Sequence, residues 1–328
     1  MLNSENNDLN VDLDLTIIVP LYNEEESLAE LTSWIYSSLK SKGFTYEIIF
    51  VDDGSSDNSW KIICDLKKSY SFVKGLRFRR NYGKSAALHC GFEMALGGIV
   101  VSMDADLQDS PEEIPLMVSM IKEQGFDLVS GWKRKRYDPP GKTIPSRLFN
   151  YTARLVSGIK LHDFNCGLKA YRREVVKNIE VYGEMHRYIP ILAKRVGFNK
   201  IGEKEVQHQE RKYGVTKFGL DRFVKGFLDL MSVMFISKFG NRPMHLFGFL
   251  GILTFTAGLL SALWLGIRKL WYVHLEIPAQ RISESPYFYI ALVCMILGTQ
   301  LFMTGFIAEL VSRTKSDRNI YHISERID

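Results

Sequence analysis

The chain has 328 residues, of which 46% are hydrophobic and 24% are charged, and its formal net charge is +5. This composition is ordinary for a globular protein with one large domain or two modest ones. The net charge is too small to suggest a nucleic-acid-binding protein, and the sequence has no motif of that kind. The four cysteines show no C-x-x-C pairing, which agrees with a reducing compartment.

The first fourteen residues are rich in Asn, Asp and Glu. They contain neither a basic region nor an apolar stretch, so they do not have the pattern of a signal peptide. We therefore predict a disordered tail over residues 1–14.

From residue 15 onward, short apolar strand patterns alternate with helical patterns. The predicted strands are 15–20, 46–52, 73–78, 99–102 and 128–130. Helical patterns follow the first three strands, and they continue to Lys40 in the first case and to Leu96 in the third. This alternation predicts an α/β fold with a largely parallel sheet and helices on both of its faces.

Acidic and amide side chains follow the predicted strand 99–102. Asp104 and Asp106 are separated by one residue, Gln108 comes two residues later, and Ser110 is placed to cap the next helix. Ligands bind at the carboxyl edge of such sheets, and hard oxygen atoms suit Mg²⁺ or Mn²⁺ bound to a phosphate. An isolated Asp-x-Asp is more often a solvated turn, so the motif needs support from the rest of the chain.

Two familiar phosphate-binding loops are missing from the sequence. No Gly-x-Gly-x-x-Gly follows the first strand, which disfavours a dinucleotide-binding Rossmann domain, and the absence of Gly-x-x-x-x-Gly-Lys-[Ser/Thr] excludes a standard P-loop. Any phosphate must therefore be held by a metal ion and side chains. His186 and His208 lack metal-ligand spacing, and we interpret them as structural.

Basic amphipathic stretches lie farther along the chain. Residues 143–160 predict a helix that either lies at a membrane surface or covers the core as an ordinary surface helix. Residues 218–239 have the same character and lead directly into an apolar stretch, which favours the membrane interface. Between them, Arg211, Lys212 and Lys217 surround a glycine turn that is suited to a phosphate, with a solvated basic loop as the alternative.

Two uncharged apolar stretches follow, at 246–267 and 287–308. Each is long enough to cross a hydrocarbon core of about 30 Å, and their glycines suit close helix packing in lipid. Basic residues are more frequent at the outer ends of the pair than in the loop between them. We therefore predict an integral protein of the inner or plasma membrane with both termini in the cytoplasm.

Eight motifs, taken together, resemble those of one family. They include Val-Asp-Asp-Gly-Ser at 51–55, Met-Asp-Ala-Asp-Leu-Gln at 103–108 and Arg-Lys-Tyr-Gly-Val-Thr-Lys at 211–217. The others are at 18–24, 80–84, 166–167, 172–174 and 184–190. This ordered set is similar to the inverting glycosyltransferases of family 2, which have a GT-A nucleotide-sugar-binding fold. Within that family it resembles the polyprenyl-phosphate enzymes, such as dolichol-phosphate mannose synthase and the bacterial undecaprenyl-phosphate glucosyltransferases.

The resemblance implies roles for individual residues. Asp104 would reach toward the nucleotide sugar, while Asp106 and Gln108 would hold Mg²⁺ or Mn²⁺ on its diphosphate. The nucleotide-binding residues implied are Pro20, Tyr22, Glu24, Asp52 and Asp104.

By the resemblance, Arg211 and Lys217 match the family's basic motif for the acceptor phosphate or the transferred diphosphate. Arg147 is a further candidate for the acceptor phosphate. Asp163 falls where the family places a further active-site acid. The catalytic residues implied are thus Asp104, Asp106, Asp163, Arg211 and Lys217. The Gln-x-x-Arg-Trp motif of the processive enzymes is missing, so polymer synthesis is disfavoured.

These expectations divide the chain into functional segments. A GT-A catalytic domain in the cytoplasm is expected, then a juxtamembrane amphipathic helix, a pair of transmembrane helices and a cytoplasmic tail. The corresponding ranges are 15–215, 216–243, 244–311 and 312–328.

The expected reaction is inverting transfer of a hexose from a nucleotide diphosphate sugar to a polyprenyl phosphate. UDP-glucose is favoured as the donor over GDP-mannose, and the resemblance admits a homo-oligomer. One alternative is a transferase acting on another membrane lipid such as diacylglycerol, with Asp163 as its base. The other is a catalytically silent membrane protein that binds a nucleotide sugar.

Overall fold

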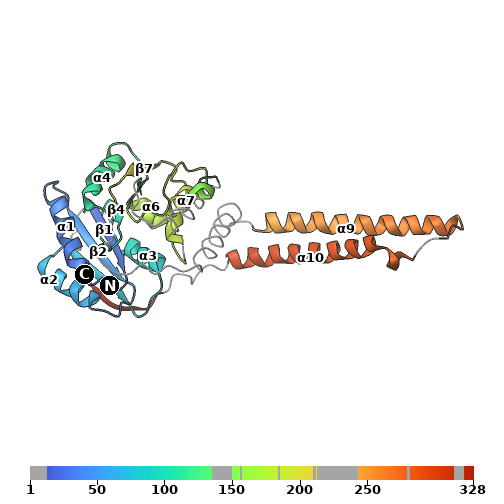
Figure 1. The fold of residues 1–328 in the computed structure, drawn as a ribbon, viewed down its shortest axis with the longest axis horizontal. Helices are drawn as coiled ribbons and strands as arrows, with labels where there is room; N and C mark the ends of the chain where they lie inside the picture. The colour runs from blue at the N-terminus through green and yellow to red at the C-terminus, as the bar shows by residue number, and fades with distance from the viewer. Residues whose placement is uncertain are drawn as a thin grey trace, which may run out of the picture. The chain divides into compact units, whose positions relative to one another are not determined.

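The computed structural model describes residues 13–134, 150–155, 157–183, 185–209, 212, 243–278, 281–313 and 321–328. The chain divides into two compact units (Figure 1). The first, the sheet unit, comprises Met1–Val233 together with Asn319–Asp328. The second, Met234–Arg318, contains two long helices.

An eight-stranded mixed sheet forms the centre of the sheet unit, in the order β7-β5-β6-β4-β1-β2-β3-β8. The central strands β4, β1, β2 and β3 are parallel to one another. β6 runs antiparallel between β4 and β5, β7 is parallel to β5, and β8 is antiparallel to β3. The strands are β1 Leu15–Leu21, β2 Tyr46–Asp52, β3 Val73–Phe78, β4 Ile99–Ser102, β5 Leu128–Trp132, β6 Lys169–Arg172, β7 Ile201–Glu205 and β8 Ile323–Ile327.

Helices cover both faces of this sheet, which confirms that expectation. Leu15, Ile17 and Val19 of β1 share a buried cluster with apolar residues of α1, α2 and α4. The alternate residue Ile18 points to the other face, where its Cγ2 atom would lie 2.5 Å from a β-carbon added at Gly91 of α3. The helices of the unit are α1 Leu28–Lys40, α2 Ser59–Ser69, α3 Lys84–Met94, η1 Pro111–Glu113, α4 Ile114–Lys122, α6 Arg173–Asn178, η2 Met185–Tyr188 and α7 Ile189–Arg195.

The predicted first five strands are present, but three further strands were not predicted. β6 makes the sheet mixed rather than largely parallel, because it pairs antiparallel with both of its neighbours. β7, Ile-Gly-Glu-Lys-Glu, has too few apolar residues to show a strand pattern, and it forms because β5 offers a free edge.

The end of the chain also differs from its prediction as part of a tail. After the second long helix, β8 returns to the sheet and extends it at the β3 edge. Gly75 of β3 lies opposite Ile327, and Phe78 lies opposite Ile323. The C-terminal residues therefore belong to the same unit as the strands at the start of the chain.

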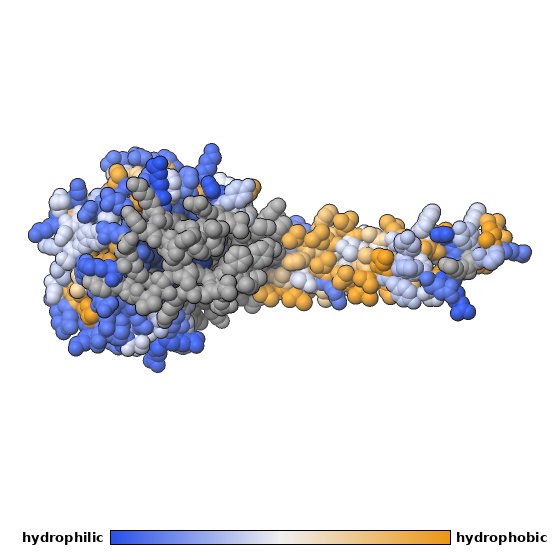
Figure 2. All heavy atoms as spheres, viewed as in Figure 1, coloured by the Kyte–Doolittle hydropathy of each residue, from blue (hydrophilic) through white to orange (hydrophobic). Residues whose placement is uncertain are grey.

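The second unit contains α9 (Pro243–His274), η3 (Ile282–Glu284) and α10 (Pro286–Arg313). The two long helices extend beyond the predicted stretches and are long and apolar enough to cross a membrane. Hydrophobic residues cover much of the pair in Figure 2. Glycines bring the helices together, since a β-carbon at Gly251 would lie 2.7 Å from the carbonyl oxygen of Gly298. This contact confirms the predicted small-residue packing.

Two predicted helices lie partly or wholly outside the described residues. Of the helix expected over 143–160, residues 150–155 and 157 are described and helical, whereas residues 158–160 are described and not helical. The helix ends before Gly158, which has a positive φ of 63°. The juxtamembrane helix expected over 216–243 lies outside the described residues except for Pro243, where α9 begins. The Ser110 cap is confirmed, because its hydroxyl accepts a hydrogen bond from the Glu112 amide.

Candidate active site

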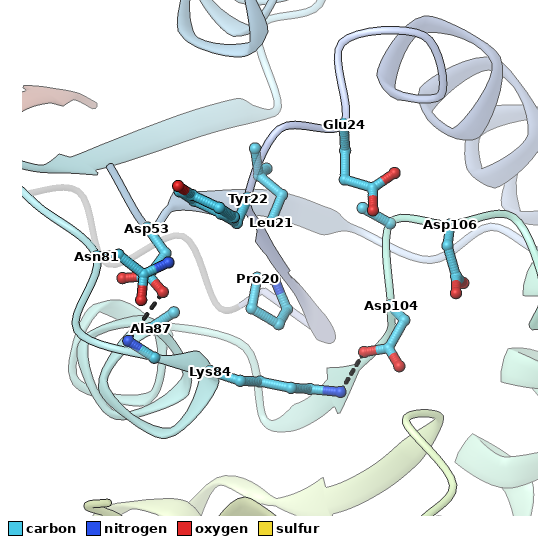
Figure 3. A pocket seen from close by; sticks show the side chains of 12 residues that line it. Pro20, Leu21, Tyr22, Glu24, Asp53, Asn81, Lys84, Ala87, Asp104 and Asp106 are labelled. Carbon is cyan, nitrogen blue, oxygen red and sulfur yellow. Dashed lines mark hydrogen bonds and ion pairs between the residues drawn. The ribbon is translucent and has the colours of Figure 1, made fainter. Parts of the chain in front are cut away.

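A cleft of about 350 Å³ opens at the carboxyl ends of β1 and β4. Figure 3 shows Glu24 and Asp106 on one side of the cleft and Asp53 and Asn81 on the other. The acidic loop after β4 therefore lies at the sheet edge where ligands bind in open α/β folds. The cleft is lined by Pro20, Leu21, Tyr22, Glu24, Asp53, Asn81, Gly83, Lys84, Ala87, Asp104, Ala105 and Asp106.

Asp104 forms an ion pair with Lys84, the first residue of α3 (Figure 3). Burial alone would raise the pKa of this carboxyl group, but the charges of Lys84 and two further lysines outweigh burial and lower the pKa to about 2. Gly167 leaves room for the carboxylate, since a β-carbon there would lie 2.4 Å from Asp104 Oδ2. Asp104 is therefore held as an anion in a fixed position.

The two further lysines are Lys133, which is partly buried, and Lys169, which is buried. Lys133 Nζ is 2.6 Å from a carboxylate oxygen of Asp109, which has no exposed surface. Lys169 donates to the carbonyl oxygen of Cys166, and burial lowers its pKa. The two lysines therefore place positive charge next to the acidic loop.

Asp106 and Gln108 lie on a tight turn of the same loop. The intervening Leu107 has a positive φ of 59°, and the Gln108 amide donates to Asp106 Oδ1 at 3.3 Å. Among the described residues, no group of three or more His, Cys, Asp or Glu side chains could hold a metal ion. This donor set nevertheless fits Mg²⁺ or Mn²⁺, because such ions are commonly bound by one or two carboxylates together with substrate phosphates.

The neighbouring acids Asp52 and Asp53 lie in different surroundings. Asp53 lines the cleft, and its carboxylate accepts hydrogen bonds from the Tyr82 and Gly83 amides at 2.7 and 2.9 Å. The fully buried Asp52 instead accepts from the Ser55 amide at 2.8 Å. Burial raises the pKa of both acids. The sequence prediction placed Asp52 at the pocket, whereas the structure places Asp53 there.

Two loops beside the cleft are packed tightly against each other. Gly54 has a φ of 75°, and a β-carbon there would lie 2.6 Å from the carbonyl carbon of Arg80. On the other side, the side chain of Asn23 accepts from the Ser56 amide at 2.8 Å, and the Asn23 amide donates to Ser55 Oγ at 2.9 Å. These contacts connect loop 52–57 to residues on both sides of the cleft.

Asp163 is buried, with 1% of its surface exposed, and it does not line the cleft. Its Oδ1 atom accepts a hydrogen bond from the Asn165 amide at 3.0 Å. The structure therefore does not bring Asp163 to the cleft surface with Asp104 and Asp106.

His186 supports the first turn of α3. Its amide donates to Ser85 Oγ at 3.0 Å, and the same oxygen lies 3.1 Å from His186 Nδ1. Burial, followed by the charge of Lys84, keeps the pKa of His186 well below its ordinary value. A neutral ring that contacts Ser85 agrees with the interpretation of this histidine as structural.

The predicted acceptor residues Arg147, Arg211 and Lys217 lie outside the described residues. The chain shortly before Arg211 is described, and the amide of Gln209 donates to the carbonyl oxygen of Gln108 at 3.0 Å. Lys212 is also described, and its ammonium group lies 2.7 Å from the Glu30 carboxylate.

Sequence reasoning did not single out Asp53, Asn81 or Lys84 as site residues. Asn81 and Lys84 do lie within the 80–84 motif of the family resemblance, so that motif could have identified them. Nothing in the pattern at 51–55 distinguishes Asp53 from Asp52, because both are acids at the end of one strand.

Comparisons with known proteins point to one family. The model of the family described as glycosyl transferase family 2 matches residues 16–180. A dodecaprenyl-phosphate galacturonate synthase of Rhizobium johnstonii is 37% identical over 309 residues, which cover 92% of this chain and 88% of that protein. An undecaprenyl-phosphate 4-deoxy-4-formamido-L-arabinose transferase of Shewanella sediminis is 34% identical, with coverage of 94% and 89%.

Solved structures show a similar fold. A glucosyl-3-phosphoglycerate synthase from Mycobacterium tuberculosis in complex with uridine diphosphate has a TM-score of 0.52 and 19% identity, covering 69% of this chain and 80% of that chain. A second structure of that enzyme, with Mn²⁺, UDP-glucose and phosphoglyceric acid, has a TM-score of 0.51 and 18% identity, covering 69% and 79%. At this level of identity, the likeness concerns the fold alone.

Proposed function

Because the chain belongs to glycosyltransferase family 2, we propose that it transfers a sugar from a nucleotide diphosphate sugar to a polyprenyl phosphate. The observation that carries this proposal is the cleft, where Asp104 and Asp106 lie together with Tyr22, Glu24 and Asp53 at the carboxyl edge of the sheet. A nucleotide diphosphate sugar brings a base, a ribose and a diphosphate, and the cleft offers aromatic, acidic and basic side chains for these groups.

The names of the relatives support a polyprenyl-phosphate acceptor. Both relatives described above are named for transfer to such a lipid, and their alignments cover more than nine-tenths of this chain. The part left uncovered is shorter than either α9 or α10, so the similarity extends into the apolar helices. A lipid acceptor also gives these helices a purpose, because its chain does not leave the bilayer.

A divalent cation, Mg²⁺ or Mn²⁺, is proposed at Asp106 and Gln108. The donor set fits such an ion when the diphosphate of the donor supplies further oxygen ligands. When bound, the ion would supply positive charge to the leaving diphosphate. Asp104, held as an anion by Lys84, would orient the sugar beside it.

The acceptor phosphate needs little help from a base. A phosphate monoester has a second pKa of about 6, so at neutral pH its oxygen is largely ionised. Arg147, Arg211 and Lys217 are proposed to bind this anion and to offset its repulsion from the donor. Attack on the anomeric carbon from the side opposite the diphosphate inverts the configuration in one step.

The position of Asp163 favours this acceptor over diacylglycerol. A neutral hydroxyl would need a base at the cleft surface, and Asp163 was the residue expected to serve as that base. Its carboxylate is buried and already accepts a hydrogen bond from Asn165. An ionised phosphate does not require it.

The path of the chain supports the proposed membrane topology. The helices α9 and α10 lie in sequence between strands of one sheet, because β8 follows them and pairs with β3. If both helices cross the bilayer, the two crossings return the chain to its starting side, as β8 requires. The basic residues at the outer ends of the pair favour the cytoplasm for that side.

Four sugars are candidates for the group that is transferred from the donor. UDP-glucose is the donor that the resemblance favours, with GDP-mannose second. The relatives are named for galacturonate and for 4-deoxy-4-formamido-L-arabinose, so these sugars belong in the panel as well.

The test is transfer of radiolabelled sugar to undecaprenyl phosphate by the full chain purified in detergent. UDP and GDP derivatives of the four sugars are compared with Mg²⁺, with Mn²⁺ and with EDTA. A metal-dependent lipid product that mild acid hydrolyses is expected from one donor. Binding of a donor without any lipid product would contradict the proposed acceptor, and transfer to diacylglycerol would replace it.

A further inference from the structure

We propose that the C-terminal segment Tyr321–Ile327, which follows α10 in sequence, positions the loops of the donor cleft. The proposal rests on the proposed function for its substrate, a nucleotide diphosphate sugar. Its structural basis is a set of contacts between this segment and two loops, 52–57 and 79–83. Asp53 and Asn81, which line the cleft, belong to these loops.

The first set of contacts begins at Glu325. Its carboxylate accepts a hydrogen bond from Trp60 Nε1 at 2.6 Å, and its other oxygen lies 3.7 Å from Arg77 Nη1. Arg77 in turn pairs with Asp52 at 3.5 Å and donates to the Ser55 carbonyl oxygen at 3.0 Å. Glu325 therefore orients the arginine that holds both ends of the turn at 52–55.

The same turn reaches the other side of the cleft. Ser55 Oγ accepts from the amide of Asn23, which has a positive φ of 56° and lies between Tyr22 and Glu24. The Glu24 amide donates to Ser59 Oγ at 3.1 Å. A displacement of loop 52–57 would therefore move the backbone that carries two residues of the cleft wall.

The second set of contacts begins at Tyr321. Its ring centroid lies 5.7 Å from that of Phe78, 5.5 Å from that of Tyr82 and 6.1 Å from that of His89. The carbonyl oxygen of the next residue, His322, accepts a hydrogen bond from the Arg79 amide at 3.0 Å. The segment therefore packs against loop 79–83 through both its side chains and its backbone.

The two sets of contacts converge on Asp53. The amides of Tyr82 and Gly83 donate to its carboxylate, while Gly54 packs against the backbone of Arg80. Tyr321 contacts loop 79–83, and Glu325 contacts the arginine that holds loop 52–57. The C-terminal segment therefore fixes the position of one loop relative to the other. Residues that follow the apolar helix pair in sequence thus support, without lining it, a cleft whose lining residues all come from the first third of the chain.

The test uses the full chain with Tyr321→Ala and Glu325→Gln. Loss of the aromatic cluster is expected to raise the KM for the donor about tenfold, and loss of the exposed ion pair about threefold. The KM for undecaprenyl phosphate and kcat are expected to stay unchanged. Tyr321→Phe keeps the ring and is expected to restore the KM of the wild-type protein. Arg326→Gln is the matched control, because Arg326 lies on the same strand and pairs with Asp328.

A second measurement does not depend on the reaction. Amide hydrogen exchange without ligand is expected to be faster in loops 52–57 and 79–83 of Tyr321→Ala, and unchanged in β1. Unchanged exchange together with an unchanged donor KM would overturn the proposal. A rise in the donor KM that is matched by an equal rise in the acceptor KM and an equal fall in kcat would also overturn it. If the wild-type protein transfers no sugar, the proposed function fails, and the exchange rates still decide whether this segment holds the loops.

Discussion

The sheet unit and the α9–α10 pair bury opposite kinds of residue. In the sheet unit the fully buried residues include the large side chains of Phe50 and Tyr171. In the helix pair the buried residues include Gly251 and Gly258, while Trp264 is 68% exposed. Water drives large apolar side chains inward, whereas lipid does not, and helices in lipid associate through close backbone contact. The difference indicates that the two units fold in different solvents.

The comparison also assigns the two units different roles: the sheet unit carries the cleft, and the helix pair carries the apolar surface. All lining residues of the cleft belong to the sheet unit, whereas Gly251, Gly258 and Gly298 of the helix pair lie against backbone atoms and apolar side chains. A substitution in one unit should therefore leave the properties of the other unchanged. Four predictions test this separation.

The largest effect is expected from Asp106→Asn at the cleft. Loss of the carboxylate proposed to bind the metal should lower the transfer rate about 10³-fold or more, since charge stabilisation at a leaving group commonly contributes that much. The rate is measured as radiolabelled lipid formed over time, and the thermal unfolding of the sheet unit should not change. Asp65→Asn, at an exposed aspartate of α2, is the control. Near-normal turnover with unchanged metal dependence would remove the metal assignment.

A change beneath the acidic loop should mainly affect stability. Lys133→Met leaves the fully buried Asp109 carboxylate without its cation, and breaking a buried pair in this way costs about 3–5 kcal/mol. The free energy of unfolding of the sheet unit is measured by denaturant titration in detergent. Lys68→Met breaks an exposed pair with Asp65 and should cost less than about 1 kcal/mol. Similar losses in both variants would contradict the burial argument.

A change in the helix pair should be smaller and confined to that unit. Gly298→Val places side-chain atoms where a β-carbon would already lie 2.5 Å from the Phe255 amide nitrogen, and such overpacking costs about 1–3 kcal/mol. Faster amide exchange is expected in α9 and α10, with donor binding unchanged. Gly266→Val serves as the control, because a β-carbon at Gly266 meets no atom within 4 Å. Equal exchange in the two variants would argue against close glycine packing.

The smallest effect concerns Asp104 in acid. Its folded-state pKa of about 2 lies below the ordinary 3.8, so its contribution to stability is complete above pH 3.8 and is lost as the pH falls toward 2. Lys84→Met removes the nearest cation, which should raise this pKa and make the loss of stability in that window less steep. The effect is limited by solvent screening, since the Asp104 side chain is 32% exposed. Unfolding followed from pH 2 to 6 measures it, and identical slopes would contradict the role of Lys84.

Much of the fold could be predicted from local patterns. The strands at 15–21 and 46–52 contain apolar runs, Ile17–Val19 and Ile48–Val51, because both faces of a parallel sheet are covered by helices. The two long helices were predictable because their apolar length exceeds that of ordinary core helices. The glycines at their contact were predictable because small residues permit close approach.

The missed strands β6, β7 and β8 have no comparable local signal. Each is short, and β7 and β8 are largely polar, so their pairing depends on edges offered by distant parts of the chain. Only the folded sheet shows that the edge of β3 is covered by residues more than two hundred positions away. Long-range pairing of this kind leaves no periodicity in the sequence.

By itself, the sequence determined the alternation of strands and helices, the acidic loop after Ser102 and the two apolar helices, because each depends on residues that are neighbours in the chain. Only the tertiary structure decided that Asp53 rather than Asp52 faces the cleft, since successive side chains leave a strand in opposite directions and the sheet sets which direction is open. It also decided that Lys84 meets Asp104 and that Tyr321 meets Tyr82, because these contacts join segments that come together only when the sheet is complete.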